Sequence, residues 1–372
     1  MIVELIEKLG LSSYFSGQDV PYSQLSLEQL KNMTILERIQ ANDWKLEYIT
    51  LAFTAVFVIL FKLGDFYNQW LVTNYLKALK GVFTKNFAQY GVSSDGSLYV
   101  KDSSESYSSY ATGRANIAKV DLTFRLAPRH NSFVWILETL LSIFTESVQA
   151  PTDRVDIVIT PSAEYDNFIS AIVSKLGMND FRKFNYYLSL TKTSDSARLP
   201  ESFVFMSEAA EFQDKTLTEE LRQSLKLDTA SFLRFIAITD QPTEKPATIP
   251  ECQPVRRIVV STKLVTGSDQ LAQISKVLNS VFNLVDHLAT KKISFKPEAL
   301  KKIVKTREVE ISKIKKIDEE IKAEKLAEEQ AKLKKQEQAR LRNLSSAEQE
   351  KLEKKALEKK QRKAQRKQKL RM

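Results

Sequence analysis

Residues 44–62 read WKLEYITLAFTAVFVILFK, and the apolar run at their centre, Tyr48–Phe61, holds fourteen residues without a charge. It is the longest uncharged apolar run in the chain. Fourteen residues is short for a helix that crosses a bilayer, which needs about 20 apolar residues. On length alone the run fits a buried core helix or an interfacial segment, and both remain alternatives to a membrane span.

The residues at the two ends of the apolar run favour the membrane span. Charged side chains at positions 45, 47 and 62 are long enough to extend toward lipid headgroups. Aromatic side chains of the kind that anchor helices at membrane interfaces flank the run: Trp44, Tyr48, Tyr67 and Trp70. Eighteen helical residues, Leu46–Leu63, would extend about 27 Å. We therefore predict a transmembrane helix over residues 44–64.

Charges on the two sides of the predicted span set its orientation. On the C-terminal side four lysines lie close to the span, with only Asp65 against them: Lys62, Lys77, Lys80 and Lys85. Residues 1–47 instead carry seven acidic and four basic residues. Because positive residues are retained in the cytosol, this asymmetry predicts a lumenal N-terminus, with residues 1–43 as a short lumenal segment, and a cytosolic C-terminus.

This orientation gives a meaning to the tripeptide Asn32-Met33-Thr34, which matches the acceptor pattern for N-glycosylation. A chance match is the alternative for any single tripeptide of this kind. A second match, Asn343-Leu344-Ser345, would lie in the cytosol and stay unmodified. Asn32 is thus a predicted glycosylation site, and modification of the second match alone would contradict the predicted orientation.

The span is followed by a helix, a loop and a mixed domain. Apolar residues spaced by three and four predict a membrane-proximal helix from about Phe66 to Gln89, within residues 65–90. Residues 91–112 contain eight serines and an Asp-Gly pair, which predicts a flexible Ser-rich loop. The αβ domain, predicted to be cytosolic, then extends over residues 113–290. The fold class predicted for the whole chain is α+β.

Within the αβ domain, hydrophobic patterns predict the individual elements. The expected strands are 120–126, 155–159, 186–190, 203–206, 232–238 and 257–264. The expected helices are 133–144, 168–176, 217–227 and 271–288.

Residues 291–372 form a tail with a different charge balance. The tail has 28 basic and 14 acidic residues, or +14, whereas the other 290 residues have 28 basic and 32 acidic residues, or −4. A helix is predicted from Pro297 to Leu344, about 72 Å long, with a weak coiled-coil seam. The seam residues are Leu300, Val304, Ile311, Ile314 and Ile321. Capping residues around Ser345 predict a break and a second helix.

The last fourteen residues contain eight basic side chains and no acid. This terminal basic cluster consists of Lys359, Lys360, Arg362, Lys363, Arg366, Lys367, Lys369 and Arg371. Neutralising several phosphates releases counterions, so such a cluster is typical of RNA binding without sequence readout. An anionic membrane surface is the main alternative, and a solvated or disordered tail is the other. The cluster lacks aromatic residues for membrane insertion, which favours ribosomal RNA.

Signatures of catalysis and of cofactor binding are missing from the sequence. There is no Gly-rich phosphate loop, no nucleophile elbow and no His-Glu-x-x-His motif. Cys252, His130 and His287 are too few for a Cys/His metal site. A single cysteine also forbids an intramolecular disulfide, which fits a reducing compartment. We therefore expect no enzymatic activity, no cofactor and no metal.

The order of these parts resembles the coiled-coil domain-containing protein 47 family, also called calumin, of the endoplasmic reticulum. The resemblance rests on the order and spacing of short motifs along the chain. These motifs are Trp44-Lys45, Thr112-Gly113-Arg114, Arg198-Leu199-Pro200, Met206-Ser207-Glu208 with Glu211, Thr239-Asp240-Gln241 and Leu357-Glu358-Lys359-Lys360. It implies a subunit of the PAT intramembrane chaperone complex in the endoplasmic reticulum membrane. The implied partners are an Asterix-like small membrane subunit, the Sec61 translocon, the ribosome through its RNA, and nascent multipass membrane proteins.

The first 43 residues depart from the family pattern. Animal members carry a long acidic lumenal region linked to calcium binding, whereas residues 1–43 here hold six acidic residues that are not clustered. A role in calcium homeostasis is therefore an alternative that the sequence does not favour. A membrane tether whose basic arm binds anionic lipid or RNA is the other alternative.

Overall fold

The computed structural model describes residues 26–37, 44–93, 96–145, 148–342, 358 and 361–362. The chain divides into two compact units. The αβ unit comprises Met1–Asp240 and Arg256–Phe295, and the arm unit comprises Gln241–Val255 and Lys296–Met372. The predicted α+β fold class is confirmed by the helices and strands of the described residues.

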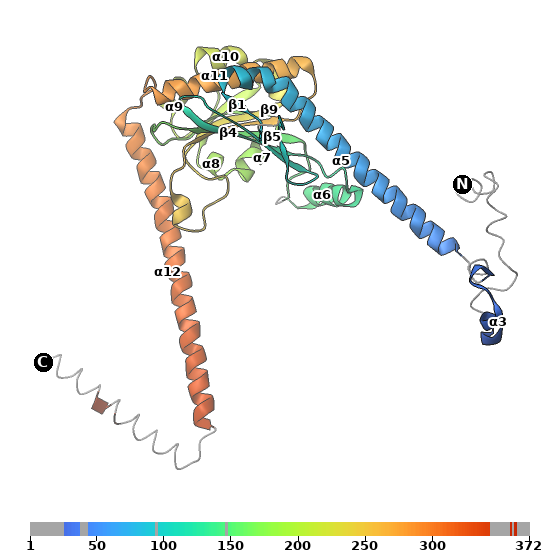
Figure 1. Cartoon of the computed structure of the whole chain (residues 1–372). Helices are drawn as coiled ribbons and strands as arrows, with labels where there is room; N and C mark the ends of the chain where they lie inside the picture. Colours follow the sequence, from blue (N-terminus) through green and yellow to red (C-terminus); the bar gives the residue numbers. More distant parts are fainter. Residues whose placement is uncertain are drawn as a thin grey trace. The chain divides into compact units, whose positions relative to one another are not determined.

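Helix α5, Lys45–Asn86, is the longest element of the αβ unit (Figure 1). Its 42 residues form one unbroken helix, about 63 Å long at 1.5 Å per residue. The predicted transmembrane and membrane-proximal helices are therefore parts of a single element. Before α5, the structure describes residues 26–37, which contain the short helix α3, Leu27–Asn32.

The centre of the αβ unit is an antiparallel sheet of ten strands. The order of the strands is β1-β3-β4-β5-β10-β9-β6-β8-β7, and β2 pairs with β3 outside this path. The strands are β1 (Gln89–Tyr90), β2 (Val100–Lys101), β3 (Ser106–Thr112), β4 (Ile117–Arg125), β5 (Arg154–Pro161), β6 (Ser170–Ser174), β7 (Lys192–Ser194), β8 (Phe203–Ser207), β9 (Leu233–Thr239) and β10 (Arg257–Lys263).

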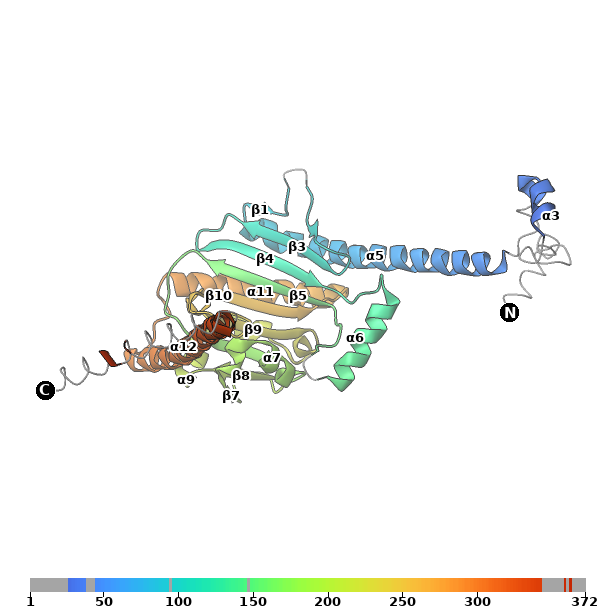
Figure 2. The same ribbon diagram turned by 90° about the horizontal axis from the view of Figure 1, so that it is seen from below.

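Helices lie on both faces of this sheet. They are α6 (Ser132–Phe144), α7 (Met178–Phe184), α8 (Tyr186–Ser189), α9 (Ala210–Thr216), α10 (Glu219–Ser224) and α11 (Ser268–Ala289), with 3-10 turns η2 (Leu227–Ser231) and η3 (Pro250–Cys252). Figures 1 and 2 show α11 and the second half of α5 on one face, and α7 and α8 on the other. Because both faces are covered, every residue of β6, β8 and β9 is buried.

Three sequence predictions for this unit were wrong. Residues 168–176 contain strand β6 instead of a helix, because a short apolar run buried on both faces has no distinguishing period. Residues 186–190 contain the one-turn helix α8 instead of a strand. The Ser-rich segment 91–112 is not a loop throughout, since its last seven residues form β3, where buried and half-buried residues alternate.

The arm unit contains α12, Pro297–Arg342, a helix of 46 residues and about 69 Å. Helix α12 begins at the predicted Pro297. Ile303 and Ile314 are buried, whereas Val304 and Ile321 of the predicted seam are exposed. Coiled-coil pairing of this helix stays a prediction.

Candidate membrane-embedded site

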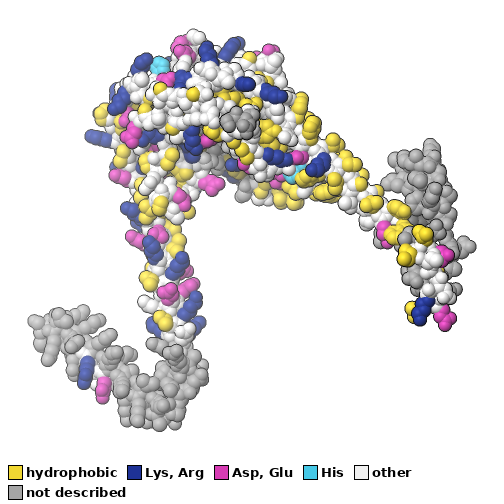
Figure 3. Space-filling model, in the orientation of Figure 1, with side chains coloured by type: hydrophobic (Ala, Val, Ile, Leu, Met, Phe, Trp, Pro, Cys, Tyr) yellow, Lys and Arg dark blue, Asp and Glu magenta, His cyan; other side chains and the backbone are white. Residues whose placement is uncertain are grey.

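The first half of α5 exposes apolar side chains on all sides. Ile49, Leu51 and Phe53 are 64%, 66% and 63% exposed, and the apolar residues up to Leu63 are also exposed except Phe57 and Phe61, which are half-buried (Figure 3). The predicted alternative of a buried core helix is therefore wrong for this segment. Within the part of the chain that the structure describes, α5 is the one helix long and apolar enough to cross a membrane.

Polar groups within this segment are satisfied by the helix itself. The Thr50 hydroxyl donates to the Glu47 carbonyl oxygen at 2.8 Å, and the Thr54 hydroxyl donates to the Thr50 carbonyl oxygen at 2.8 Å. In a bilayer no water is available to take these hydrogen bonds, so internal partners are required. The segment therefore meets the polar as well as the apolar conditions for lipid surroundings.

The sheet first contacts α5 where the apolar segment ends. At Gly64 a Cβ atom would lie only 2.3 Å from the Arg129 carbonyl oxygen and 2.5 Å from the His130 nitrogen. One turn earlier, the rings of Phe61 and His130 meet edge to face with centroids 5.2 Å apart. Glycine at position 64 thus permits a backbone contact that any side chain would prevent.

A polar junction follows immediately on the next turn of α5. Asn68 is fully buried, and its amide nitrogen donates to the carbonyl oxygens of Ser104 at 3.0 Å and Ala127 at 3.1 Å. Arg129 donates to the Asn68 side-chain oxygen at 3.0 Å and to both carboxylate oxygens of Asp153, at 2.8 and 2.6 Å. Each polar atom of Asn68 therefore has a partner in the sheet connections.

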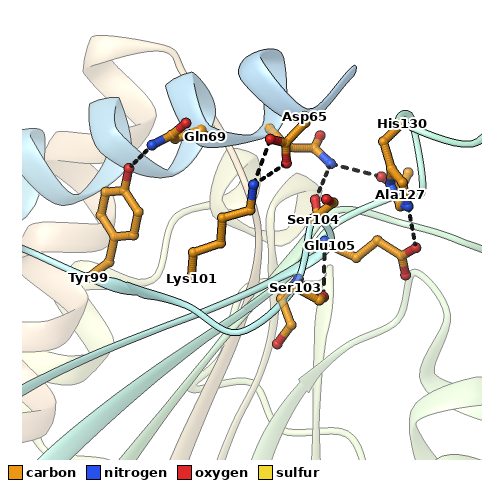
Figure 4. A network of polar contacts seen from close by, with 11 residues as sticks. Asp65, Gln69, Tyr99, Lys101, Ser103, Ser104, Glu105, Ala127 and His130 are labelled. Atoms are coloured by element: carbon orange, nitrogen blue, oxygen red, sulfur yellow. Dashed lines mark hydrogen bonds and ion pairs between the residues drawn. The ribbon is translucent and has the colours of Figure 1, made fainter. Parts of the chain in front are cut away.

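A second ion pair lies beside this junction. Lys101 contacts both carboxylate oxygens of Asp65, at 2.5 and 2.6 Å, and Gln69 donates to the Tyr99 hydroxyl at 2.8 Å (Figure 4). Burial alone would raise the pKa of Asp65, but hydrogen bonds from Lys101 and Ser104 lower it below its ordinary value. The carboxylate of Asp65 is thus held in its charged form where the apolar segment ends.

His130 and Glu105 complete the group of charges shown in Figure 4. The His130 Nε2 atom lies 3.6 Å from the Glu105 carboxylate. Burial raises the pKa of Glu105; His130 acts against this shift and Glu138 acts with it. The hydrogen bonds of the neighbouring Arg129 to Asp153 raise the pKa of its guanidinium, although burial alone would lower it.

The second half of α5 is packed into the αβ unit. Leu76, Leu79 and Phe83 are fully buried. The Tyr75 hydroxyl lies 3.3 Å from the Thr262 hydroxyl of β10, and the rings of Phe83 and Phe282 of α11 are 6.0 Å apart. The exposed apolar segment is therefore the direct continuation of a helix fixed in the core.

The residues predicted for ribosome binding are mostly outside the described residues. Arg362 is in a helical residue pair and is exposed. The other seven of the cluster, which lie outside the described residues, are Lys359, Lys360, Lys363, Arg366, Lys367, Lys369 and Arg371. Asn32 is exposed at the end of α3.

Two functional features were missed in the sequence. Asp153, immediately before β5, forms an ion pair with Arg129 in the junction, and no sequence pattern links these two residues. Helix α6 was predicted as an ordinary helix of the domain, whereas none of its residues is buried. Its sequence, SFVWILETLLSIF, has one charge in thirteen residues, and this composition was the available signal.

These features define a class: an α+β protein in which one candidate membrane span is fixed to the folded unit by a polar junction. Residues 43–363 match the family model described as PAT complex subunit CCDC47, and the chain belongs to this family. The resemblance inferred from sequence motifs is thereby confirmed. The family is described as a complex subunit and not by an enzymatic activity.

Two relatives from yeasts extend the comparison. A UPF0674 endoplasmic reticulum membrane protein of Schizosaccharomyces pombe is 29% identical over 297 residues, which cover 77% of this chain and 79% of the relative. A UPF0674 endoplasmic reticulum membrane protein of Saccharomyces cerevisiae is 26% identical over 347 residues, covering 85% and 86%. Together with the candidate span, these matches support a role at the endoplasmic reticulum membrane.

Proposed function

We propose that this chain is a non-enzymatic, single-pass protein of the endoplasmic reticulum membrane that assists the biogenesis of multipass membrane proteins. The observation that carries the proposal is the hydrogen-bonded connection between the exposed apolar half of α5 and the αβ unit through Arg129, Asn68 and Asp153. Membership of the PAT complex subunit family supports an assisting role within a complex. The proposed client is a nascent transmembrane segment beside the first half of α5.

The proposed orientation has the N-terminus in the lumen and the αβ unit in the cytosol. Lys77, Lys80 and Lys85 support it, because these exposed lysines lie on the C-terminal side of the apolar segment. Asn32, exposed at the end of α3, is accessible for modification in this orientation. Expression in microsomes should yield a glycosidase-sensitive form that Asn32→Gln abolishes and Asn343→Gln leaves unchanged. The reverse result would contradict the orientation.

The basic arm is proposed to bind the ribosome through its RNA. Helix α12 is long and largely exposed, and the terminal basic cluster beyond it has the charge density that phosphate backbones attract. The proposed neighbours are the Sec61 translocon and an Asterix-like small membrane subunit. Anionic lipid remains the competing target for the same charges.

Ribosome co-sedimentation of the full-length protein at increasing salt tests the arm. Replacing all eight residues of the terminal basic cluster by Gln should abolish the salt-sensitive part of binding. The matched control removes the same charge from α12, at exposed Lys301, Lys302, Lys305, Lys315, Lys316, Lys325, Lys332 and Lys334. Equal losses in the two variants would show that net charge alone decides binding. An unchanged first variant would contradict a role for the cluster.

A further inference from the structure

Helix α6 has its apolar side turned away from the protein. At 100° per residue, seven large apolar side chains fall within one half of the helix surface. They are 41% to 82% exposed: Phe133, Ile136, Leu137, Leu140, Leu141, Ile143 and Phe144. A helix that packs on a folded domain in water has the opposite arrangement, with its apolar side inward.

The polar residues of α6 occupy the other side of the helix. Ser132, Glu138 and Ser142 lie on this side and are half-buried, whereas Trp135 on the same side is 42% exposed, so part of this side faces the αβ unit. The Thr139 hydroxyl donates to the Trp135 carbonyl oxygen at 2.7 Å, and the Ser142 hydroxyl donates to the Thr139 carbonyl oxygen at 2.7 Å. The polar groups are therefore satisfied internally while the apolar side faces outward.

The start of α6 lies where the apolar segment of α5 ends. The residues immediately before α6 are Arg129 and His130, whose backbone contacts α5 at Gly64. Asn131 caps the helix by accepting from the Val134 nitrogen at 3.3 Å. Figures 1 and 2 both show α6 running across the direction of α5. If α5 crosses a bilayer, α6 therefore starts at its surface and runs along it.

We propose that α6 is embedded in the cytosolic leaflet of the membrane as an in-plane helix whose apolar side contacts lipid acyl chains. Thirteen residues extend about 20 Å, which is too short to cross the hydrocarbon core of about 30 Å. A contiguous exposed apolar face of this kind marks a surface that contacts a membrane or another protein. Lipid is the occupant that the continuity with the apolar segment of α5 favours. With α5, helix α6 would fix the orientation of the αβ unit on the membrane.

This inference rests on the proposed anchorage by α5, and the two can be tested separately. Full-length protein with Cys252→Ser is reconstituted into phosphatidylcholine vesicles, and one cysteine is introduced for an environment-sensitive fluorophore. The positions are Leu140→Cys in α6, Phe53→Cys in α5 and Gln223→Cys at an exposed position of α10. All three positions are at the protein surface, so folding should be preserved.

Nitroxide-labelled lipid and aqueous iodide then quench the fluorophore in separate experiments. We expect nitroxide lipid to remove roughly half of the fluorescence at positions 53 and 140, and iodide to act only at position 223. Quenching by lipid at 53 but by iodide at 140 would overturn the α6 proposal and leave the anchorage intact. Access of iodide to both would overturn both. Protection of position 140 from both quenchers would show that a second copy covers α6, which would also overturn it.

Discussion

The two halves of α5 use similar apolar residues for different surroundings. In the first half Ile49, Leu51 and Phe53 face outward on every side, whereas in the second half Leu79 and Phe83 are fully buried. Exposed lysines, Lys77, Lys80 and Lys85, lie on the outer side of the second half, whereas residues 48–61 of the first half carry no charge. A helix that is apolar all round needs an apolar environment, and a helix with one apolar side needs a folded partner.

The change between the two halves occurs within one turn of helix. Gly64 allows the chain before α6 to touch the helix backbone. One turn later, Asn68 forms hydrogen bonds to the αβ unit, whereas the residues before Gly64 present exposed apolar side chains. The polar junction therefore marks the depth at which the bilayer would end and the αβ unit begin. The predictions below test this contrast, beginning with the largest expected effect.

Truncation of one phenylalanine in each half is the most direct comparison. Phe83→Ala should lower the free energy of unfolding of the detergent-solubilised protein by about 3–5 kcal/mol, because Phe83 is fully buried against other rings. Phe53→Ala should change it by about 0.5 kcal/mol or less. Chemical denaturation followed by tryptophan fluorescence measures both. Equal losses would mean that the first half is also packed in the protein.

Removal of the junction arginine should have the next largest effect. Arg129→Leu removes the hydrogen bonds to the Asn68 side-chain oxygen and to both carboxylate oxygens of Asp153, which keeps one hydrogen bond, from the Ala127 nitrogen. The side chains of Arg129 and Asp153 are 24% and 21% exposed. We therefore expect the free energy of unfolding to fall by about 2–3 kcal/mol, less than for a fully buried ion pair. The control is Lys119→Leu, which removes a more exposed ion pair to Asp121 and should cost about 1 kcal/mol or less.

The two glycines of α5 offer a matched pair of smaller changes. Gly64→Ala should destabilise the protein by about 1–3 kcal/mol, because its Cβ would collide with the Arg129 carbonyl group. Gly81→Ala should stabilise it by about 0.5–1 kcal/mol, since nothing lies within 4 Å and alanine favours helix. Thermal unfolding should show melting temperatures that move in opposite directions. A shift of the same sign in both would contradict the close contact at Gly64.

Alkaline pH should weaken the packing of the second half. Burial raises the pKa of Tyr75 from 10.0 to about 12, so the stability it contributes is complete below pH 10 and is lost as pH rises through about 12. At pH 11 the loss attributable to Tyr75 is about 1 kcal/mol. The free energy of unfolding of the Tyr75→Phe variant should therefore fall less steeply between pH 10 and 12 than that of the natural chain. Identical slopes would show that Tyr75 titrates freely.

Elements with a clear period or length could be predicted from the sequence. The strands β5, β9 and β10 and the helix α11 were found because their patterns are long and unambiguous. Strand β6 was missed because burial on both faces removes the alternation, and the Ser-rich β3 because serine is typical of loops. Such cases depend on neighbours that local sequence does not encode.

The candidate site was predictable only in part. The apolar run identified the first half of α5, because fourteen uncharged residues are visible without any structure. The pairing of Arg129 with Asp153 was not visible, because 24 residues separate them and charged residues at strand edges are common. The outward side of α6 could not be predicted either, since amphipathic spacing does not say which side meets the protein.

Carbonate extraction of microsomes that contain the full-length protein decides whether the first half of α5 is embedded in a bilayer. We expect the chain to stay in the membrane pellet and a variant with Val56→Asp and Ile59→Asp to be released, because two charges at the centre of the span oppose insertion. Recovery of the natural chain in the carbonate supernatant would contradict the embedding of α5 in the membrane.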